Sequence, residues 1–130
     1  MMIGEQDKGI AGEAQFVERI AKIRVRFSSK LADKIMQANA ALPNMAGDGS
    51  DAVVTVAIAY RDFHDVCGVA PTIGYTAIGR LARACEAILL EPFRAQRGLS
   101  REELARLTES IESLRIAALT EMQSTVLDGR

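Results

Sequence analysis

The chain has 130 residues, which favours one domain with a single hydrophobic core. Hydrophobic residues make up 48% and charged residues 25%, a balance typical of globular proteins rather than disordered chains. The formal net charge of −1 argues against a dedicated nucleic-acid binder, because phosphate-backbone binding requires an excess of lysine and arginine. Aromatic residues are only 5% of the chain, which favours helices over strands.

No segment of the sequence has the pattern of a membrane span or an export signal. The longest apolar stretch, residues 52–60, is about half the length that a bilayer-spanning helix needs. The two cysteines, Cys67 and Cys85, lack a CxxC spacing and are expected to be reduced thiols in a cytoplasmic protein. Nothing resembles a phosphate-binding glycine loop, so we expect no ATP binding.

The first part of the chain predicts a leader and a long helix. Residues 1–12 are polar and contain glycines, and a flexible leader or short helix is expected there. From Glu13 onward, apolar residues recur every three or four positions, the spacing of one buried helix face. These positions are Phe16, Ile20, Ile23, Phe27, Leu31, Ile35, Ala38 and Leu42. Pro43 stops this helix, and residues 44–49 have the composition of a loop.

A second helix is predicted to follow this loop. Ser50 or Asp51 can cap its start, and Pro71 should end it near Val69 or Ala70, because the residue before a proline avoids the α region. Its apolar positions predict the buried face, which comprises Val53, Val56, Ala59, Tyr60, Phe63, Val66 and Ala70.

A third helix is predicted to begin between Gly74 and Thr76. Pro92 should end or kink this helix, and Gly98 should close the segment. The residues expected to face inward are Ile78, Leu81, Cys85, Ile88 and Leu89.

The fourth helix has the clearest start in the sequence. Ser100 and Glu103 form a capping box, and Leu99 with Leu104 forms the matching hydrophobic staple. Its apolar face comprises Leu104, Leu107, Ile111, Leu114, Ala118 and Met122. Four amphipathic helices with short loops predict an all-α fold, an antiparallel up-down four-helix bundle over residues 13–130.

His64 is the only histidine, and a glycine follows it four positions later. Glycine inside a helix costs roughly 1 kcal/mol relative to alanine, so Gly68 should have a packing or functional reason. Helical side chains lean toward the N-terminus, so a side chain at position 68 would lean over His64. Gly68 therefore leaves the imidazole open to a large partner, unless it only permits close helix packing.

This segment resembles the histidine-containing phosphotransfer (HPt) family of two-component phosphorelays. The family motif is roughly His-x-Leu-Lys-Gly-x-Ala, followed by a glycine and an amphipathic helix. His64, Gly68, Ala70 and Gly74 match it, and Val66 replaces the leucine conservatively. The helix layout is similar over roughly residues 13–127.

The resemblance implies that His64 carries the phosphoryl group. It would accept this group from one receiver-domain aspartate and pass it to another, using the imidazole nitrogen farthest from the backbone. The implied partners are response-regulator receiver domains and a hybrid histidine kinase, within cytoplasmic signal transduction. The protein would be a stoichiometric phosphoprotein rather than an enzyme. It would need no cofactor of its own, because the receiver brings the Mg²⁺ ion.

One position departs from the family pattern. Members commonly carry lysine just before the motif glycine, where this chain has Cys67. A phosphoryl group brings nearly two negative charges, so a nearby cation should stabilise it. Arg61 lies three residues before His64 and shares its helix face, so it could take over the role of the lysine, or it could be an ordinary solvated charge. Arg80 and Arg83 could dock an acidic receiver surface, or they could be ordinary solvated charges.

Three other interpretations compete with a phosphorelay. His64 and Cys67 could form half of a metal site, but zinc normally has four ligands and no second pair is evident, so we expect no metal. A cofactor-binding bundle lacks the ligands for haem or a di-iron centre. A helical-bundle adaptor that binds a receiver or kinase domain without being phosphorylated remains open, and a buried His64 would favour it.

Overall fold

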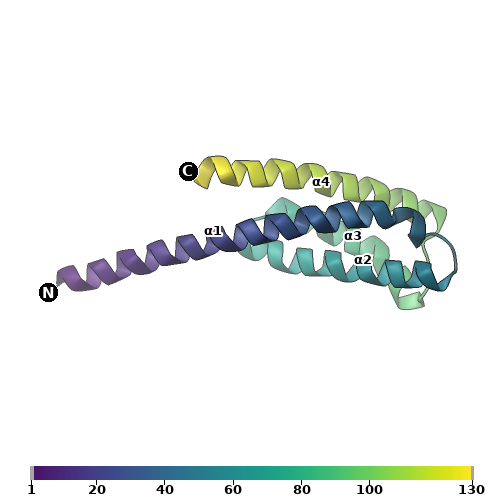
Figure 1. Cartoon of the computed structure of the whole chain (residues 1–130), viewed down its shortest axis with the longest axis horizontal. Helices are drawn as coiled ribbons and strands as arrows, with labels where there is room; N and C mark the ends of the chain where they lie inside the picture. The colour runs from purple at the N-terminus through teal and green to yellow at the C-terminus, as the bar shows by residue number, and fades with distance from the viewer. Residues whose placement is uncertain (1, 130) are drawn as a thin grey trace.

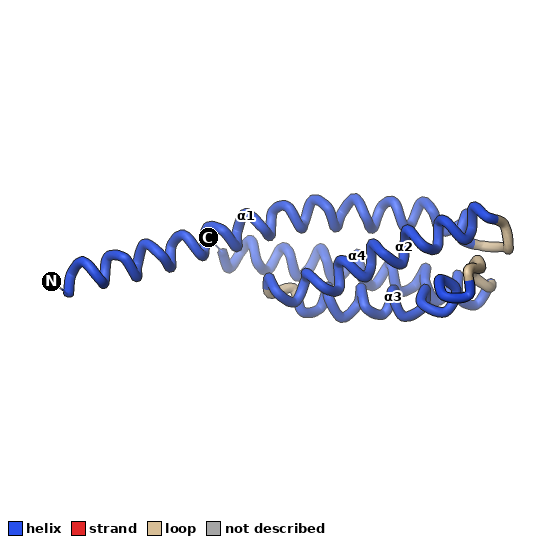
Figure 2. Tube along the Cα trace, turned by 90° about the horizontal axis from the view of Figure 1, so that it is seen from below, coloured by secondary structure: helices blue, strands red, loops and turns tan. Residues whose placement is uncertain are grey.

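A computed structural model describes the backbone of residues 2–129 and the side chains of residues 12–123. It contains the helices α1 (Met2–Ala41), α2 (Ser50–Val69), α3 (Thr76–Ala95) and α4 (Arg101–Gly129), with 3₁₀ turns η1 (Leu42–Met45) and η2 (Ala70–Ile73). Successive helices run in opposite directions and pack side by side (Figures 1 and 2). The predicted all-α bundle is confirmed, and within the described residues no helix has the length and apolarity to cross a membrane.

The first helix is longer than predicted. It begins at Met2 rather than at Glu13. The glycines in residues 2–12 weaken a helix but do not stop it, and this segment contains no proline, which would. Its N-terminal part runs past the ends of the neighbouring helices (Figure 1). Met1 and Arg130, the outer limits of the predicted leader and bundle, lie outside the described residues.

The predicted buried face of α1 is wrong in the N-terminal part of this helix. Phe16 continues the apolar spacing but is 62% exposed, because the N-terminal part of α1 runs past the other helices (Figure 1). Ile23 has residues of α2 nearby and is 37% exposed. From Phe27 onward the prediction is confirmed, and the buried residues are Phe27, Leu31, Ile35, Ala38 and Leu42. The apolar spacing therefore predicted which face of α1 is apolar, but not how much of that face packs against other helices.

The core of α2, α3 and α4 lies largely where the apolar spacing predicted it. Its buried members include Val56, Phe63, Val66, Ile78, Cys85, Leu89, Leu107, Ile111 and Leu114. Ala52, Cys67 and Ala82 are also buried, although the sequence analysis did not place them there.

Two predicted helix ends need correction. Neither Ser50 nor Asp51 caps α2; the cap is Gly49, whose carbonyl oxygen accepts hydrogen bonds from the backbone N–H groups of residues 52 and 53. Pro92 lies inside α3, one turn before the helix ends at Ala95. Gln96, in the left-handed conformation, terminates it, so Gly98 is not its terminator.

Contacts between distant segments fix α3 relative to its neighbours. The carboxylate of Glu121 in α4 accepts hydrogen bonds from the backbone N–H groups of Ala77 (3.1 Å) and Ile78 (2.9 Å), so α4 caps the start of α3. At the same end, Gly79 packs against Pro71, and a Cβ at position 79 would lie 2.8 Å from the proline ring. These contacts join the start of α3 to α4 and to η2, the turn that follows α2.

Candidate functional site

His64 lies on the outer surface of α2, and 63% of its side chain is exposed. Its ring stacks on Tyr60, with centroids 6.0 Å apart, and Tyr60 stacks in turn on Phe93 of α3 at 4.3 Å. One side of the imidazole is therefore supported by a column of aromatic rings. The predicted accessibility of His64 is confirmed.

A carboxylate from the neighbouring helix faces the inner nitrogen of this ring. The Oε1 atom of Glu86, in α3, lies 3.4 Å from His64 Nδ1. A carboxylate beside Nδ1 favours the neutral tautomer that carries its proton there. The outer nitrogen, Nε2, then keeps a free lone pair and can act as a nucleophile.

Cys67 completes this group from one turn further along α2. Its thiol donates a hydrogen bond to Glu86 Oε2 at 2.8 Å and lies 3.3 Å from the carbonyl oxygen of His64. Burial and the hydrogen bond to the Glu86 carboxylate raise the pKa of Cys67 to about 11. The side chain is thus a protonated thiol at neutral pH, and it holds Glu86 in place.

The Glu86 carboxylate is ionised despite its burial. Burial alone would raise its pKa, but the hydrogen bond from Cys67, the contact with His64 and the positive charge of Arg83 together hold that pKa below its usual value. Arg83 lies one helical turn before Glu86 on α3. One of the two arginines predicted to dock a partner therefore acts electrostatically on the site itself.

Gly68 faces open space. A Cβ built on it would have no neighbouring atom within 4 Å, so the interpretation that this glycine permits close helix packing is wrong. Gly68 and His64 both line the same groove, and the steric interpretation remains a prediction.

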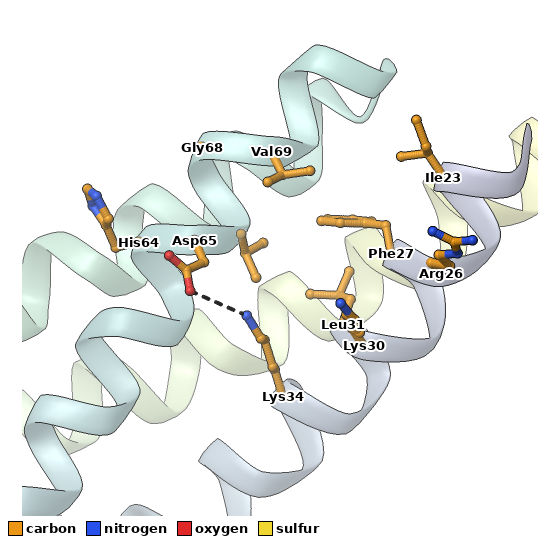
Figure 3. A pocket seen from close by; sticks show the side chains of 11 residues that line it. Ile23, Arg26, Phe27, Lys30, Leu31, Lys34, His64, Asp65, Gly68 and Val69 are labelled. Carbon is orange, nitrogen blue, oxygen red and sulfur yellow. Dashed lines mark ion pairs between the residues drawn. The ribbon is translucent and has the colours of Figure 1, made fainter. Parts of the chain in front are cut away.

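This groove runs between α1 and α2 and has a volume of about 580 Å³ (Figure 3). Basic residues of α1, namely Arg26, Lys30 and Lys34, line it together with the apolar side chains of Ile23, Phe27, Leu31, Val66 and Val69. Lys34 lies 3.9 Å from Asp65 across the groove, as the dashed line in Figure 3 shows. His64 stands at the rim and points outward.

The structure brings together only some of the residues singled out in the sequence. His64 and Cys67 meet at Glu86, which the sequence analysis missed. Arg61 and Arg80 are exposed and form no hydrogen bond or ion pair with any residue whose side chain is described. Cys85 is fully buried in the core, and burial raises its pKa to about 12.

No protein-family model, curated protein or solved structure matches the chain.

Proposed function

We propose that the protein is a histidine phosphotransfer protein in which His64 relays a phosphoryl group between receiver-domain aspartates. The observation that carries this proposal is the orientation of His64, with Nδ1 facing Glu86 and the rest of the ring exposed. A phosphoryl acceptor needs an exposed, neutral imidazole on a rigid support. The packing of α2 against α3 and the stacking on Tyr60 supply that support.

The chemistry follows from this orientation. The lone pair of Nε2 attacks phosphorus in line, a P–N bond forms, and the P–O bond to the receiver aspartate breaks, releasing the aspartate as a carboxylate. Positive charge develops on the ring as the P–N bond forms, and Glu86 stabilises it beside Nδ1–H. The reverse reaction delivers the group to a second receiver, and the Mg²⁺ ion remains the receiver's contribution.

The groove between α1 and α2 offers a docking surface beside His64. Two of its basic side chains, Arg26 and Lys30, suit an acidic partner, and Phe27 and Val69 add apolar area. The charge of Lys34 is already matched by Asp62 at 3.8 Å and Asp65 at 3.9 Å. On the α3 side, Arg80 and Arg83 extend the positive charge. Receiver domains and a hybrid histidine kinase in the cytoplasm are the partners that this proposal implies.

The adaptor alternative explains the groove but not the histidine. An adaptor needs no exposed nucleophile, whereas His64 has one nitrogen turned toward a carboxylate and 63% of its side chain in solvent. This exposure favours the relay.

Phosphotransfer from a ³²P-labelled receiver domain tests the proposal. The protein should acquire an acid-labile, alkali-stable phosphate, and His64→Gln should abolish it while circular dichroism shows unchanged helix content. Ile58→Gln is the matched control, because Ile58 is also exposed on α2 but does not line the groove. Labelling that survives in His64→Gln contradicts the proposal, as does a failure of all the source organism's receivers to label the parent.

A further inference from the structure

Three different metal-binding groups converge beside the exposed imidazole. One ligand atom each from His64, Cys67 and Glu86 lie within 4.8 Å of one another. His64 and Cys67 are three residues apart and share a face of α2, and Glu86 approaches from α3. The sequence contains only a His-x-x-Cys pair, and the third ligand becomes visible when the helices pack.

The spacing fits a small tetrahedral ion. Zinc binds nitrogen and oxygen at about 2.0–2.1 Å and sulfur at about 2.3 Å, so tetrahedral ligands lie roughly 3.3–3.6 Å from each other. The separation of His64 Nδ1 from Glu86 Oε1 is 3.4 Å, and Cys67 Sγ lies 2.8 Å from Oε2, the other oxygen of the same carboxylate. To bind an ion, the hydrogen-bonded pair would have to open by about 0.7 Å, and the three ligand atoms, which lie within 4.8 Å of one another, would have to close around it.

We propose that His64, Cys67 and Glu86 form a zinc site with three protein ligands and a fourth position open to solvent. Imidazole, thiolate and carboxylate together suit Zn²⁺ or Co²⁺ rather than Mg²⁺, which takes oxygen ligands. Cys67 is buried and Glu86 is half-buried, so the ion would enter from the exposed side of His64.

The binding reaction balances at these three residues. The Cys67 thiol releases its proton to solvent and forms a Zn–S bond. The imidazole proton of His64 moves through solvent from Nδ1 to Nε2, and the lone pair that this leaves on Nδ1 and the carboxylate of Glu86 form the other two bonds. Two negative ligands neutralise the charge of the ion. The positive charge of Arg83 acts on both Glu86 and Cys67 and opposes a cation, so the affinity should rise in Arg83→Ala.

Zinc would also change the nucleophile, a consequence that rests on the proposed function. A neutral imidazole has one proton, and with Nδ1 bound to zinc that proton must be on Nε2. Nε2 then has no lone pair with which to attack phosphorus. Zinc binding and phosphoryl transfer therefore exclude each other at His64, and free zinc would switch the relay off.

Cobalt titration of the metal-free full-length protein tests the site, because Co²⁺ reports its ligands spectroscopically. One equivalent should produce a thiolate-to-cobalt charge-transfer band and the visible bands of a tetrahedral ion, and zinc should displace both. Cys67→Ser should remove the charge-transfer band, and His64→Gln or Glu86→Gln should weaken binding at least about tenfold. Cys85→Ser is the matched control and should keep the spectrum, because Cys85 lies in the core.

The site is contradicted if no such band appears in the parent, or if the band persists in Cys67→Ser. The switch is tested separately, by adding zinc during phosphotransfer from a labelled receiver. Zinc should inhibit the parent protein but not Cys67→Ser, which excludes an effect on the receiver. Equal inhibition of both proteins overturns the switch and leaves the site standing. A protein that never accepts phosphate contradicts the proposed function, while the cobalt spectrum still decides the site.

Discussion

Glu86 and Glu103 are both half-buried carboxylates with lowered pKa values, but their partners differ. Glu103 pairs with the guanidinium of Arg97 at 2.7 and 3.0 Å and accepts a hydrogen bond from the backbone N–H of Ser100 at 2.8 Å. Glu86 contacts a neutral thiol and an imidazole that is mostly in solvent. Both side chains have nearly the same exposure, 17% for Glu86 and 18% for Glu103.

The comparison separates a structural carboxylate, Glu103, from Glu86, to which the proposed function and the proposed zinc site assign a role. At Glu103 the negative charge is matched by a fixed cation, and the hydrogen bonds close the start of α4. At Glu86 the nearest groups can still change, because His64 can gain positive charge and Cys67 can lose a proton. The first arrangement stabilises the fold, and the second leaves electrostatic energy available to a reaction or a bound ion.

A substitution at Gly68 should greatly slow phosphotransfer without lowering the stability of the bundle. Gly68→Gln should leave the bundle folded, because the Cβ meets no neighbour and the helix gains up to roughly 1 kcal/mol of propensity. Phosphotransfer should fall on the order of a hundredfold, because the new side chain displaces the approaching partner from His64. Rapid-quench transfer kinetics and thermal unfolding measure the two effects. Gly12→Gln, at an exposed glycine of α1 with equal space, is the control, and equal transfer by both variants would contradict the steric argument.

Removing the charge of Glu86 should affect transfer more than stability. In Glu86→Gln the amide no longer favours a proton on Nδ1 and no longer balances the positive charge of the ring. Losing this charge partner at 3.4 Å from Nδ1 should cost about 1.4 kcal/mol of transition-state stabilisation, so transfer should slow about tenfold. ¹⁵N NMR of the imidazole should show more of the Nε2–H tautomer. Unchanged kinetics together with an unchanged tautomer would place Glu86 outside the mechanism.

The two carboxylates also differ in how far the sequence could predict them. The Ser100–Glu103 cap was predictable because its partners are three residues apart, and the structure confirms both of its hydrogen bonds. Glu86 was not, because its contacts to Cys67 and His64 join helices that are distant in sequence. His64, Cys67 and Gly68 were accessible from spacing along one helix.

The same limit applies to the fold. Helix periods predicted the faces of α2, α3 and α4, because each of these helices has a neighbour along its length. The spacing of Phe16 predicted burial that does not occur, because a period contains no information about where the neighbouring helices end. The sequence also did not predict that Lys30 and Lys34 line the groove, because only the packed structure shows which part of α2 these residues face.

Glu103→Gln should lower the stability of the fold rather than the rate of phosphotransfer. It breaks the bidentate pair with Arg97 and half of the capping box, so the free energy of unfolding should fall by about 1 kcal/mol with phosphotransfer unchanged. The hydrogen bond from Arg97 lowers the pKa of Glu103 to about 2, below its unfolded value of 4.5. Its contribution is therefore complete above about pH 4.5 and is lost as the pH falls through 2.

Urea unfolding at several pH values checks this sign. The difference in stability between the parent and Glu103→Gln should be constant at neutral pH and shrink between pH 4.5 and 2. Glu112→Gln is the control, because its pair with Arg115 is exposed and such pairs contribute little. A difference that grows on acidification would mean that the ionised carboxylate does not stabilise the cap.

The smallest effect concerns the cation that stabilises the phosphoryl group. Arg61 is exposed and has no partner among the described side chains, so nothing holds it in a fixed position near His64. An exposed ion pair is worth about 0.2–1 kcal/mol, and Arg61→Ala should therefore shorten the phosphohistidine lifetime by no more than about fivefold.

A lysine at position 67, where the HPt motif carries one, would not restore this charge beside the phosphoryl group, because position 67 is buried and its side chain contacts Glu86. Arg83→Ala is the informative comparison, since that charge already acts on Glu86. If Arg83→Ala shortens the phosphohistidine lifetime more than Arg61→Ala does, Arg83 on α3 has the role of the lysine in the HPt motif. If neither substitution shortens it, the receiver supplies the neutralising charge.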